Sequence, residues 1–218
     1  MPVTPRTASI AFGLTALLAS TVPAAVHPHV FAEARLDVLV AEGSVTALRH
    51  LWRFDDLFSS TVLVEFDMNG DLKLDDSELR DVAQTVYDSL AEFNYFQIVT
   101  ADGKDVPLNA PPQLMANYEN DQLIIMFESA PKEPLALKGK VGFGIYDPTF
   151  YTAIEFTEDE YMAVKDLPAA CTRSVIRPDP DEAIAQNQTA LTDAFFDDPS
   201  GNDLSKIFAT KLELTCTD

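Results

Sequence analysis

The stretch "VFAEARLDVLVAEGSVTALRHLWRF" (residues 30–54) decides the fold class, because it predicts two β-strands joined by a tight turn. Apolar and polar residues alternate from Val30 to Val40, which gives the first strand one apolar face. After the turn residues "AEGS", a second alternating run places Leu48, His50, Trp52 and Phe54 on its apolar face. The two runs therefore predict an antiparallel hairpin with one face in a core.

Matching the apolar faces of the two runs predicts the register of this hairpin. The predicted partners are Val40 with Thr46, Leu36 with His50 and Ala32 with Phe54, around a three-residue turn containing Gly43. Carried onward, this register places Phe31 opposite Asp55 and on the same face as His29. His50 falls on the apolar face, so we predict that it is a core residue and not a ligand.

Short strand-like runs separated by turn residues continue along the chain. Further strands are expected at residues 96–100, 113–118, 122–127, 140–146, 152–156 and 209–216. Helices are expected over residues 55–65 and 76–93, on either side of an acidic loop, and near residues 182–194. We therefore predict an α+β fold: a mainly antiparallel β-sheet or sandwich with an inserted, EF-hand-like helix-loop-helix over residues 55–93.

Composition narrows the classes of partner. The 218 residues are 47% hydrophobic, which suffices for the core of one domain. The formal net charge of −20 argues against nucleic acid and against an anionic membrane surface, since both would repel the chain. Cations remain compatible with this charge.

The N-terminus predicts export. Arg6 precedes the apolar run Ala8 to Ser20, and small residues up to Ala24 fit a signal-peptidase site, so we expect a signal peptide at residues 1–24. This leaves a single periplasmic α+β domain, residues 25–218, that does not itself span a membrane. Cys171 and Cys216 are an even pair in an oxidising compartment, so a disulfide between them is expected.

The acidic segment "DMNGDLKLDDSE" (residues 67–78) nearly matches the calcium-binding loop of an EF-hand. The ligand positions of such a loop fall on Asp67, Asn69, Asp71, Lys73 (through its carbonyl), Asp75 and Glu78. Leu72 replaces the glycine expected at the sixth position, although Gly70 lies nearby. We predict structural Ca²⁺ here. The alternative is a solvated acidic connection in which Asp75 or Asp76 caps the next helix.

A second metal site is predicted at "HPH" (residues 27–29). His27 and His29 project to the same side of an extended chain, and Pro28 favours that backbone. Two imidazoles so placed suit Zn²⁺, Cu²⁺ or Ni²⁺. The hairpin register makes His29 and Asp55 diagonal neighbours, within reach of a shared ion.

Other chemistry is sparse. Asp147 in "IYDPTFY" (residues 145–151) is a further acidic candidate, although Asp-Pro is first of all a turn signal after a strand. The sequence has no glycine-rich phosphate loop, no Gly-x-Ser-x-Gly and no His-Glu-x-x-His. We therefore expect the protein not to be an enzyme. A secreted hydrolase that uses clustered carboxylates is the alternative in that class.

Several segments together resemble a bacterial family of unknown function (domain of unknown function 1007). They are "HPHVFAEARLDV", "LRHLWRFDDLFS", "DMNGDLKLDDSEL", "IYDPTFY" and a closing strand that ends in cysteine. That family is described as the periplasmic component of an ABC-type transport system, includes ZevA-like proteins associated with zinc uptake, and is commonly encoded beside NicO-type metal permeases. The resemblance implies His27, His29, Asp55 and Asp147 as the places to look for a transition-metal site.

Two functions from different classes follow as hypotheses. The first is a periplasmic accessory protein that presents Zn²⁺, or else Ni²⁺, Co²⁺ or Cu²⁺, to an inner-membrane permease of the NicO type. The second is an extracytoplasmic interaction or assembly module whose only metal is structural Ca²⁺. The histidine pair distinguishes the two, because only the first hypothesis requires it.

Overall fold

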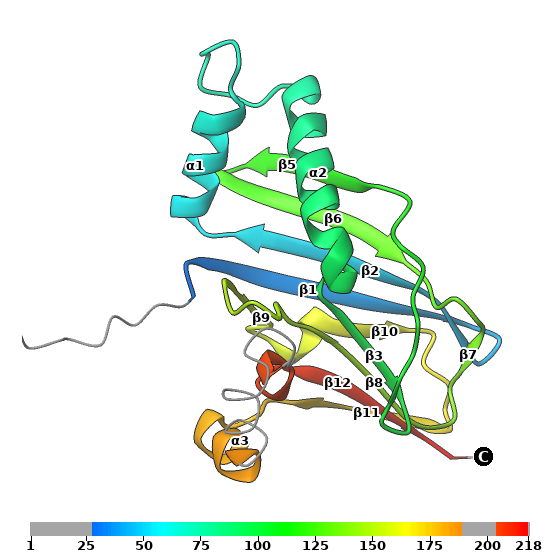
Figure 1. The fold of residues 1–218 in the computed structure, drawn as a ribbon. Helices are drawn as coiled ribbons and strands as arrows, with labels where there is room; N and C mark the ends of the chain where they lie inside the picture. Colours follow the sequence, from blue (N-terminus) through cyan, green and yellow to red (C-terminus); the bar gives the residue numbers. More distant parts are fainter. Residues whose placement is uncertain (1–27, 189–203, 218) are drawn as a thin grey trace, which may run out of the picture.

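A computed structural model describes residues 28–188 and 204–217, so the predicted signal peptide and His27 lie outside the described residues. Two β-sheets and a pair of helices make up most of this part of the chain (Figure 1). The α+β class with mostly antiparallel strand pairing is confirmed.

The first sheet has seven strands in the described part of the chain, with the path β10-β1-β2-β6-β5. Its strands are β1 (Val30–Ala41), β2 (Ser44–Phe54), β5 (Leu114–Glu119), β6 (Gln122–Ser129), β7 (Leu135–Ala136), β9 (Thr152–Glu155) and β10 (Met162–Lys165). β7 pairs with β2, while β9 and β10 both pair with β1 in parallel. The hairpin quoted above therefore forms the middle of this sheet.

The second sheet has five strands, in the order β11-β12-β8-β3-β4. They are β3 (Gln97–Ala101), β4 (Lys104–Asp105), β8 (Gly139–Ile145), β11 (Cys171–Ile176) and β12 (Lys211–Cys216). All of their pairings are antiparallel. The predicted disulfide is confirmed: Cys171 and Cys216 are bonded at a paired position of β11 and β12. In the chain-entropy model, closing a loop of 45 residues stabilises the fold by about 4 kcal/mol.

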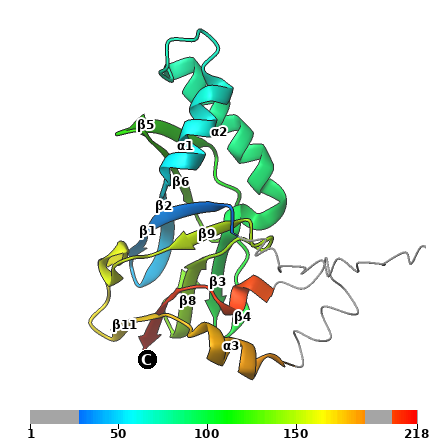
Figure 2. The same cartoon turned by 90° about the vertical axis from the view of Figure 1, so that its left-hand side faces the viewer.

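The helices are α1 (Asp56–Phe66), α2 (Asp76–Leu90) and α3 (Pro180–Gln186), with 3₁₀ turns at Ala91–Phe96, Asp159–Tyr161 and Leu204–Ile207. α1 contacts β6 and α2 contacts β5. Figure 2 shows this helix pair at one end of the molecule and the second sheet with α3 at the other. Among the described residues, no helix is both long and apolar enough to cross a membrane.

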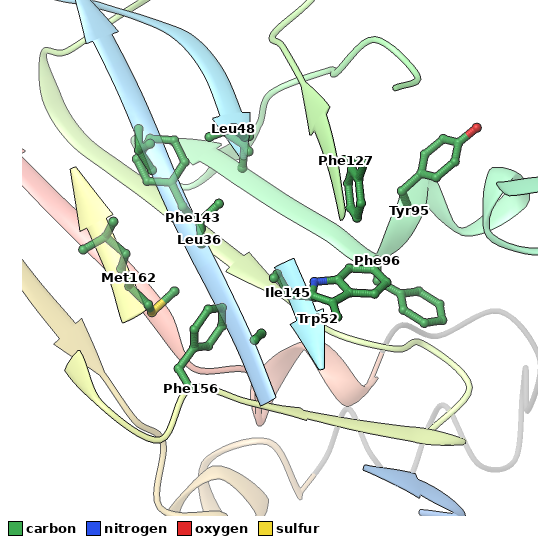
Figure 3. Packing of buried hydrophobic residues seen from close by; sticks show 14 of the residues in the cluster. Leu36, Leu48, Trp52, Tyr95, Phe96, Phe127, Phe143, Ile145, Phe156 and Met162 are labelled. Carbon is green, nitrogen blue, oxygen red and sulfur yellow. The ribbon is translucent and has the colours of Figure 1, made fainter. Parts of the chain in front are cut away.

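One hydrophobic core joins the two sheets and reaches beneath the helices. Figure 3 shows Leu36, Leu48 and Trp52 of the first sheet near Phe143 and Ile145 of the second. Each of these five side chains is almost completely buried. The alternation predicted for β1 and β2 is what supplies the first sheet's half of this core, because every second side chain points to the same face.

The hairpin register agrees with the prediction except at its turn. Leu36 pairs with His50 and Ala32 with Phe54, as predicted. The pairing of Val40 with Thr46 is wrong, because the register shifts after Leu39 and Val40 faces Val45 instead.

The turn itself explains that correction. Ala41 pairs with Ser44, so the turn has two residues and not three. Glu42 and Gly43 both have positive φ (51° and 73°), which is the backbone of a tight hairpin turn whose twist matches that of its strands. The shorter turn leaves one extra residue on the β2 side, and a β-bulge absorbs it.

Elsewhere the predicted strands are present, with ends that differ by two residues or fewer. The short strands β4, β7, β10 and β11 were missed. β11 has the sequence "CTRSVI", whose middle is exposed, so it carries no alternating pattern. The second helix ends at Leu90 and not at Phe93, because Asn94 and Tyr95 adopt positive φ (51° and 52°) and interrupt the helix.

Candidate functional site

Three segments that are distant in sequence meet where β1 begins. The backbone N–H of His29 donates to Tyr151 O at 2.9 Å, and Val30 pairs with Thr152. On the other side of β1, Asp55 N donates to Phe31 O at 2.9 Å. We call this region the strand-entry site. It contains His29, Asp55 and Asp147, which are three of the four residues predicted as transition-metal ligands.

The side chain of Asp55 forms hydrogen bonds both to the start of α1 and to the start of β1. It is the N-cap of α1, and its Oδ1 accepts from Phe58 N at 2.9 Å. Its Oδ2 accepts from Phe31 N at 2.8 Å, which confirms that Asp55 lies opposite Phe31. Both carboxylate oxygens therefore already accept a backbone hydrogen bond. Each retains a second lone pair with which it could face a cation.

Asp147 lies at the start of the loop between β8 and β9 and is only 5% exposed. Its Oδ1 accepts from the backbone N–H and the hydroxyl of Thr149, at 2.7 and 2.6 Å. Its Oδ2 accepts from Thr152 N at 2.8 Å. All three donors are neutral, and no cationic side chain within residues 28–188 and 204–217 pairs with it. Asp147 thus shapes the predicted turn and carries a charge that lacks a protein counter-ion there.

His29 is exposed and packs against Tyr151, with ring centroids 5.3 Å apart. The fourth predicted ligand, His27, lies outside the described residues. Within the described residues, no three His, Cys, Asp or Glu side chains gather closely enough to form a metal site. The fold brings His29, Asp55 and Asp147 to the same end of β1, but among the described residues their side chains do not form a cluster of three.

The acidic loop between α1 and α2 folds back on its own carboxylates. Asp67 accepts backbone hydrogen bonds from Gly70, Asp71 and Leu72, at 2.8, 3.1 and 2.8 Å. Glu78 closes the loop from the far side, because Oε1 accepts from Met68 N and Oε2 from Asp75 N, both at 2.8 Å. The first and last predicted ligands therefore organise the same loop.

The remaining predicted ligands make local contacts. Asn69 Oδ1 accepts from Asp71 N, and Asp71 Oδ1 accepts from Lys73 N. Asp75 is the N-cap of α2 and forms a capping box with Glu78. Hydrogen bonds from Glu78 N and from the hydroxyl and backbone of Ser77 lower the pKa of Asp75 below its usual value.

Leu72 takes the backbone conformation that glycine takes in an EF-hand loop. Its φ is +60°, in the left-handed region, and its side chain is 73% exposed. For a residue with a Cβ this conformation costs about 1 kcal/mol. Leu72 therefore does not prevent the tight turn, but it makes the turn less favourable.

A buried polar cluster was not predicted from the sequence. Gln97 Oε1 faces His50 Nε2 at 3.1 Å and accepts a hydrogen bond from the hydroxyl of Ser129. The carboxamide nitrogen of Gln97 donates to Asn94 O at 3.4 Å, so Oε1 is the acceptor and His50 carries its proton on Nε2. Burial lowers the pKa of His50 to about 3, which keeps the ring neutral. His50 is a core residue, as predicted.

Comparison with known proteins places the chain in a family. A family model described as "Protein of unknown function (DUF1007)" matches residues 12–216. The chain belongs to this family. This confirms the coarser part of the resemblance noted from the sequence, namely membership of a family whose function is not known.

Two relatives of this DUF1007 protein are similar over most of their own length. One is the "Uncharacterized 15.5 kDa protein in trpE 3'region" of Spirochaeta aurantia, 24% identical over 62% of this chain and 96% of the relative. The other is an uncharacterized protein of Haemophilus influenzae, 24% identical over 87% of this chain and 91% of the relative. Neither description assigns a ligand or an activity.

Proposed function

We propose that this DUF1007 protein is a periplasmic accessory protein that binds a transition metal, Zn²⁺ in the first place, and presents it to an inner-membrane permease of the NicO type. The observation that carries the proposal is that the three chain segments containing His29, Asp55 and Asp147 lie side by side at the start of β1. His27 lies two residues before His29 and would reach the same region of an extended chain.

The donor set fits the chemistry of zinc. Neutral imidazole nitrogen and carboxylate oxygen are both ordinary Zn²⁺ ligands, and three or four of them complete a site. Asp147 supplies a buried negative charge that only neutral groups accompany in the described part of the chain, so a nearby cation would be favourable. His29 is exposed, so a metal held by it could be transferred to a partner.

We further propose that the acidic loop holds a structural Ca²⁺ and makes the α1–α2 unit EF-hand-like. The loop already adopts the tight turn at Leu72, and its predicted ligands offer hard oxygens, which calcium prefers. A bound cation would also reduce the repulsion among the carboxylates of this segment. In this proposal calcium stiffens the helix pair and is not the transported ion.

Elemental analysis of the protein purified from the periplasm tests both sites at once. We expect one Zn²⁺ and one Ca²⁺ per chain after exposure to both ions. The double variant His27→Ala/His29→Ala should lose zinc and keep calcium, whereas Glu78→Gln should lose calcium and keep zinc. A wild-type protein without stoichiometric zinc, or a double histidine variant that binds zinc unchanged, would refute the transition-metal proposal.

A second candidate function has one specific observation in its favour. α1 exposes apolar side chains to solvent as well as burying some: Leu57 and Val64, seven residues apart and therefore on one face, are 75% and 76% exposed. Met68 and Leu72 in the following loop are 82% and 73% exposed. Such a surface suits an interaction or assembly module whose only metal is calcium. Calcium without zinc in the elemental analysis would favour this candidate.

A further inference from the structure

A cavity of about 320 Å³ lies between the helix pair, the first sheet and the loop that begins at Asp147. The aromatic rings among its lining residues are Trp52, Phe54, Phe58, Phe93, Phe96 and Tyr151. They form packed pairs: Trp52 stacks near Phe96 at 6.1 Å between centroids (Figure 3), and Phe54 packs on Phe58 at 5.1 Å. Ser89 and Tyr151 are exposed and therefore mark the mouth of the cavity.

Among residues 28–188 and 204–217, Asp147 is the only charged residue that lines this cavity. The other lining residues with polar side-chain atoms are Ser89, Thr149, Thr152, Trp52 and Tyr151, and both threonines already donate to Asp147. The wall therefore combines aromatic rings with one buried carboxylate, which in the described part of the chain is stabilised by neutral donors alone. This combination of an apolar wall and a negative charge favours some classes of ligand and disfavours others according to their charge.

An anion would be repelled by Asp147, and a neutral apolar molecule would remove water from the carboxylate without compensating its charge. An organic cation avoids both costs, because its nitrogen can pair with the carboxylate and its body can lie against the rings. The faces of aromatic rings also attract ammonium groups directly. The volume is at the lower end of the range for small-molecule sites, so it admits a single ring or a short alkyl body.

We propose that this cavity binds a small organic ammonium compound that has an apolar body, with Asp147 pairing the ammonium group and the aromatic rings enclosing the body. The site shares Asp147 with the proposed metal site but needs neither His27 nor His29. The two proposals can therefore fail separately. Measurements in the presence of EDTA, and on the variant His27→Ala/His29→Ala, isolate the organic ligand from any metal.

Trp52 is the single tryptophan of the chain, so its fluorescence reports directly on the cavity. The full chain, purified and treated with EDTA, is titrated with benzylamine, benzyl alcohol and benzoate, which have similar shapes and differ in charge. We expect saturable changes with benzylamine, a Kd for benzyl alcohol at least about tenfold higher, and no binding of benzoate. The double histidine variant should keep this order of affinities, since His29 packs against the ring of Tyr151 at the mouth and is not itself a lining residue of the cavity.

Two variants assign the effect to the cavity. Asp147→Asn should remove the preference for the amine over the alcohol, and Ser89→Phe should weaken both ligands by filling the mouth. Asp81→Asn, an exposed residue of α2, is the matched control and should bind as wild type does. If Asp147→Asn does not fold, the proposal is tested by the affinities of Ser89→Phe and by the order of affinities of the wild type for benzylamine, benzyl alcohol and benzoate. No saturable change, an amine that binds no tighter than the alcohol, or an amine preference that survives in Asp147→Asn would overturn the proposal.

Discussion

Asp55 and Phe31 bond to each other twice, through backbone and side chain. Phe31 O accepts from Asp55 N at 2.9 Å, and Asp55 Oδ2 accepts from Phe31 N at 2.8 Å. The same carboxylate caps α1 through Phe58 N. One side chain therefore sets where the hairpin ends, where the helix begins and how the two are oriented.

Replacing Asp55 by alanine should lower the free energy of unfolding by about 2 kcal/mol, because it removes a helix cap and the acceptor for Phe31 N. Urea denaturation measures the change. Asp81→Ala on the exposed side of α2 is the control and should change the midpoint very little. Equal midpoints for the two variants would contradict the structural role given to Asp55. Asp55→Asn should have a smaller effect, since it keeps one acceptor oxygen.

β6 pairs with β2 as far as Ile124, and the side chain of Ser59 then accepts the next backbone hydrogen bond of β6. It is completely buried, and its hydroxyl accepts from Leu123 N at 2.9 Å while donating to Phe54 O at 3.4 Å. Ser59→Ala would leave the buried N–H of Leu123 without an acceptor and should lower the free energy of unfolding by about 1 to 3 kcal/mol. Ser60→Ala provides the comparison, because Ser60 is exposed and bonds only within its own helix. The prediction fails if both variants have the wild-type urea midpoint.

His50 should make the stability of the protein depend on pH. Its pKa is about 3 in the folded protein, against an ordinary value of 6.5, so the unfolded chain binds the proton more readily. Stability from the neutral ring is therefore complete above pH 6.5 and is lost as the pH falls from there toward 3. The loss approaches about 1.4 kcal/mol per pH unit for a single group.

Urea midpoints of the wild type and of His50→Leu between pH 4 and pH 8 isolate this contribution, because every other titrating group is common to both proteins. Wild type should be the more stable at pH 8, since the leucine variant loses the contact with Gln97. Below pH 6.5 the gap between the two proteins should narrow or reverse. Parallel curves across the range would show that His50 does not titrate as described.

Leu72 and Gly70 should respond to substitution in opposite directions. Both have positive φ, at 60° and 74°, but only leucine carries a Cβ that disfavours this backbone. Leu72→Gly should raise the free energy of unfolding by about 0.5 kcal/mol, and Gly70→Ala should lower it by about 1 kcal/mol. Thermal unfolding in EDTA measures both without metal. A destabilised Leu72→Gly would mean that the leucine side chain makes a stabilising contact.

Much of the first sheet could be predicted from the sequence because a strand with one buried face repeats every two residues. That period alone predicted β1 and β2, placed His50 in the core and set Phe31 opposite Asp55. The spacing of acidic residues likewise located the loop between α1 and α2 and narrowed the cap of α2 to Asp75 or Asp76, of which the structure uses Asp75. The even number of cysteines in a chain predicted to be exported led to the expectation of a bond between Cys171 and Cys216, which the structure contains.

Contacts between residues distant in sequence were decided only by the tertiary structure, because no local sequence pattern encodes them. β10 joins β1 in parallel from more than a hundred residues away, and no short-range signal specifies such a pairing. The cluster of His50, Gln97 and Ser129 likewise comes from three separate strands. From the sequence alone, Asp147 is predicted first of all to be a turn residue. Only the packing of the helix pair over the sheet encloses it beside aromatic rings and makes a turn residue part of a cavity.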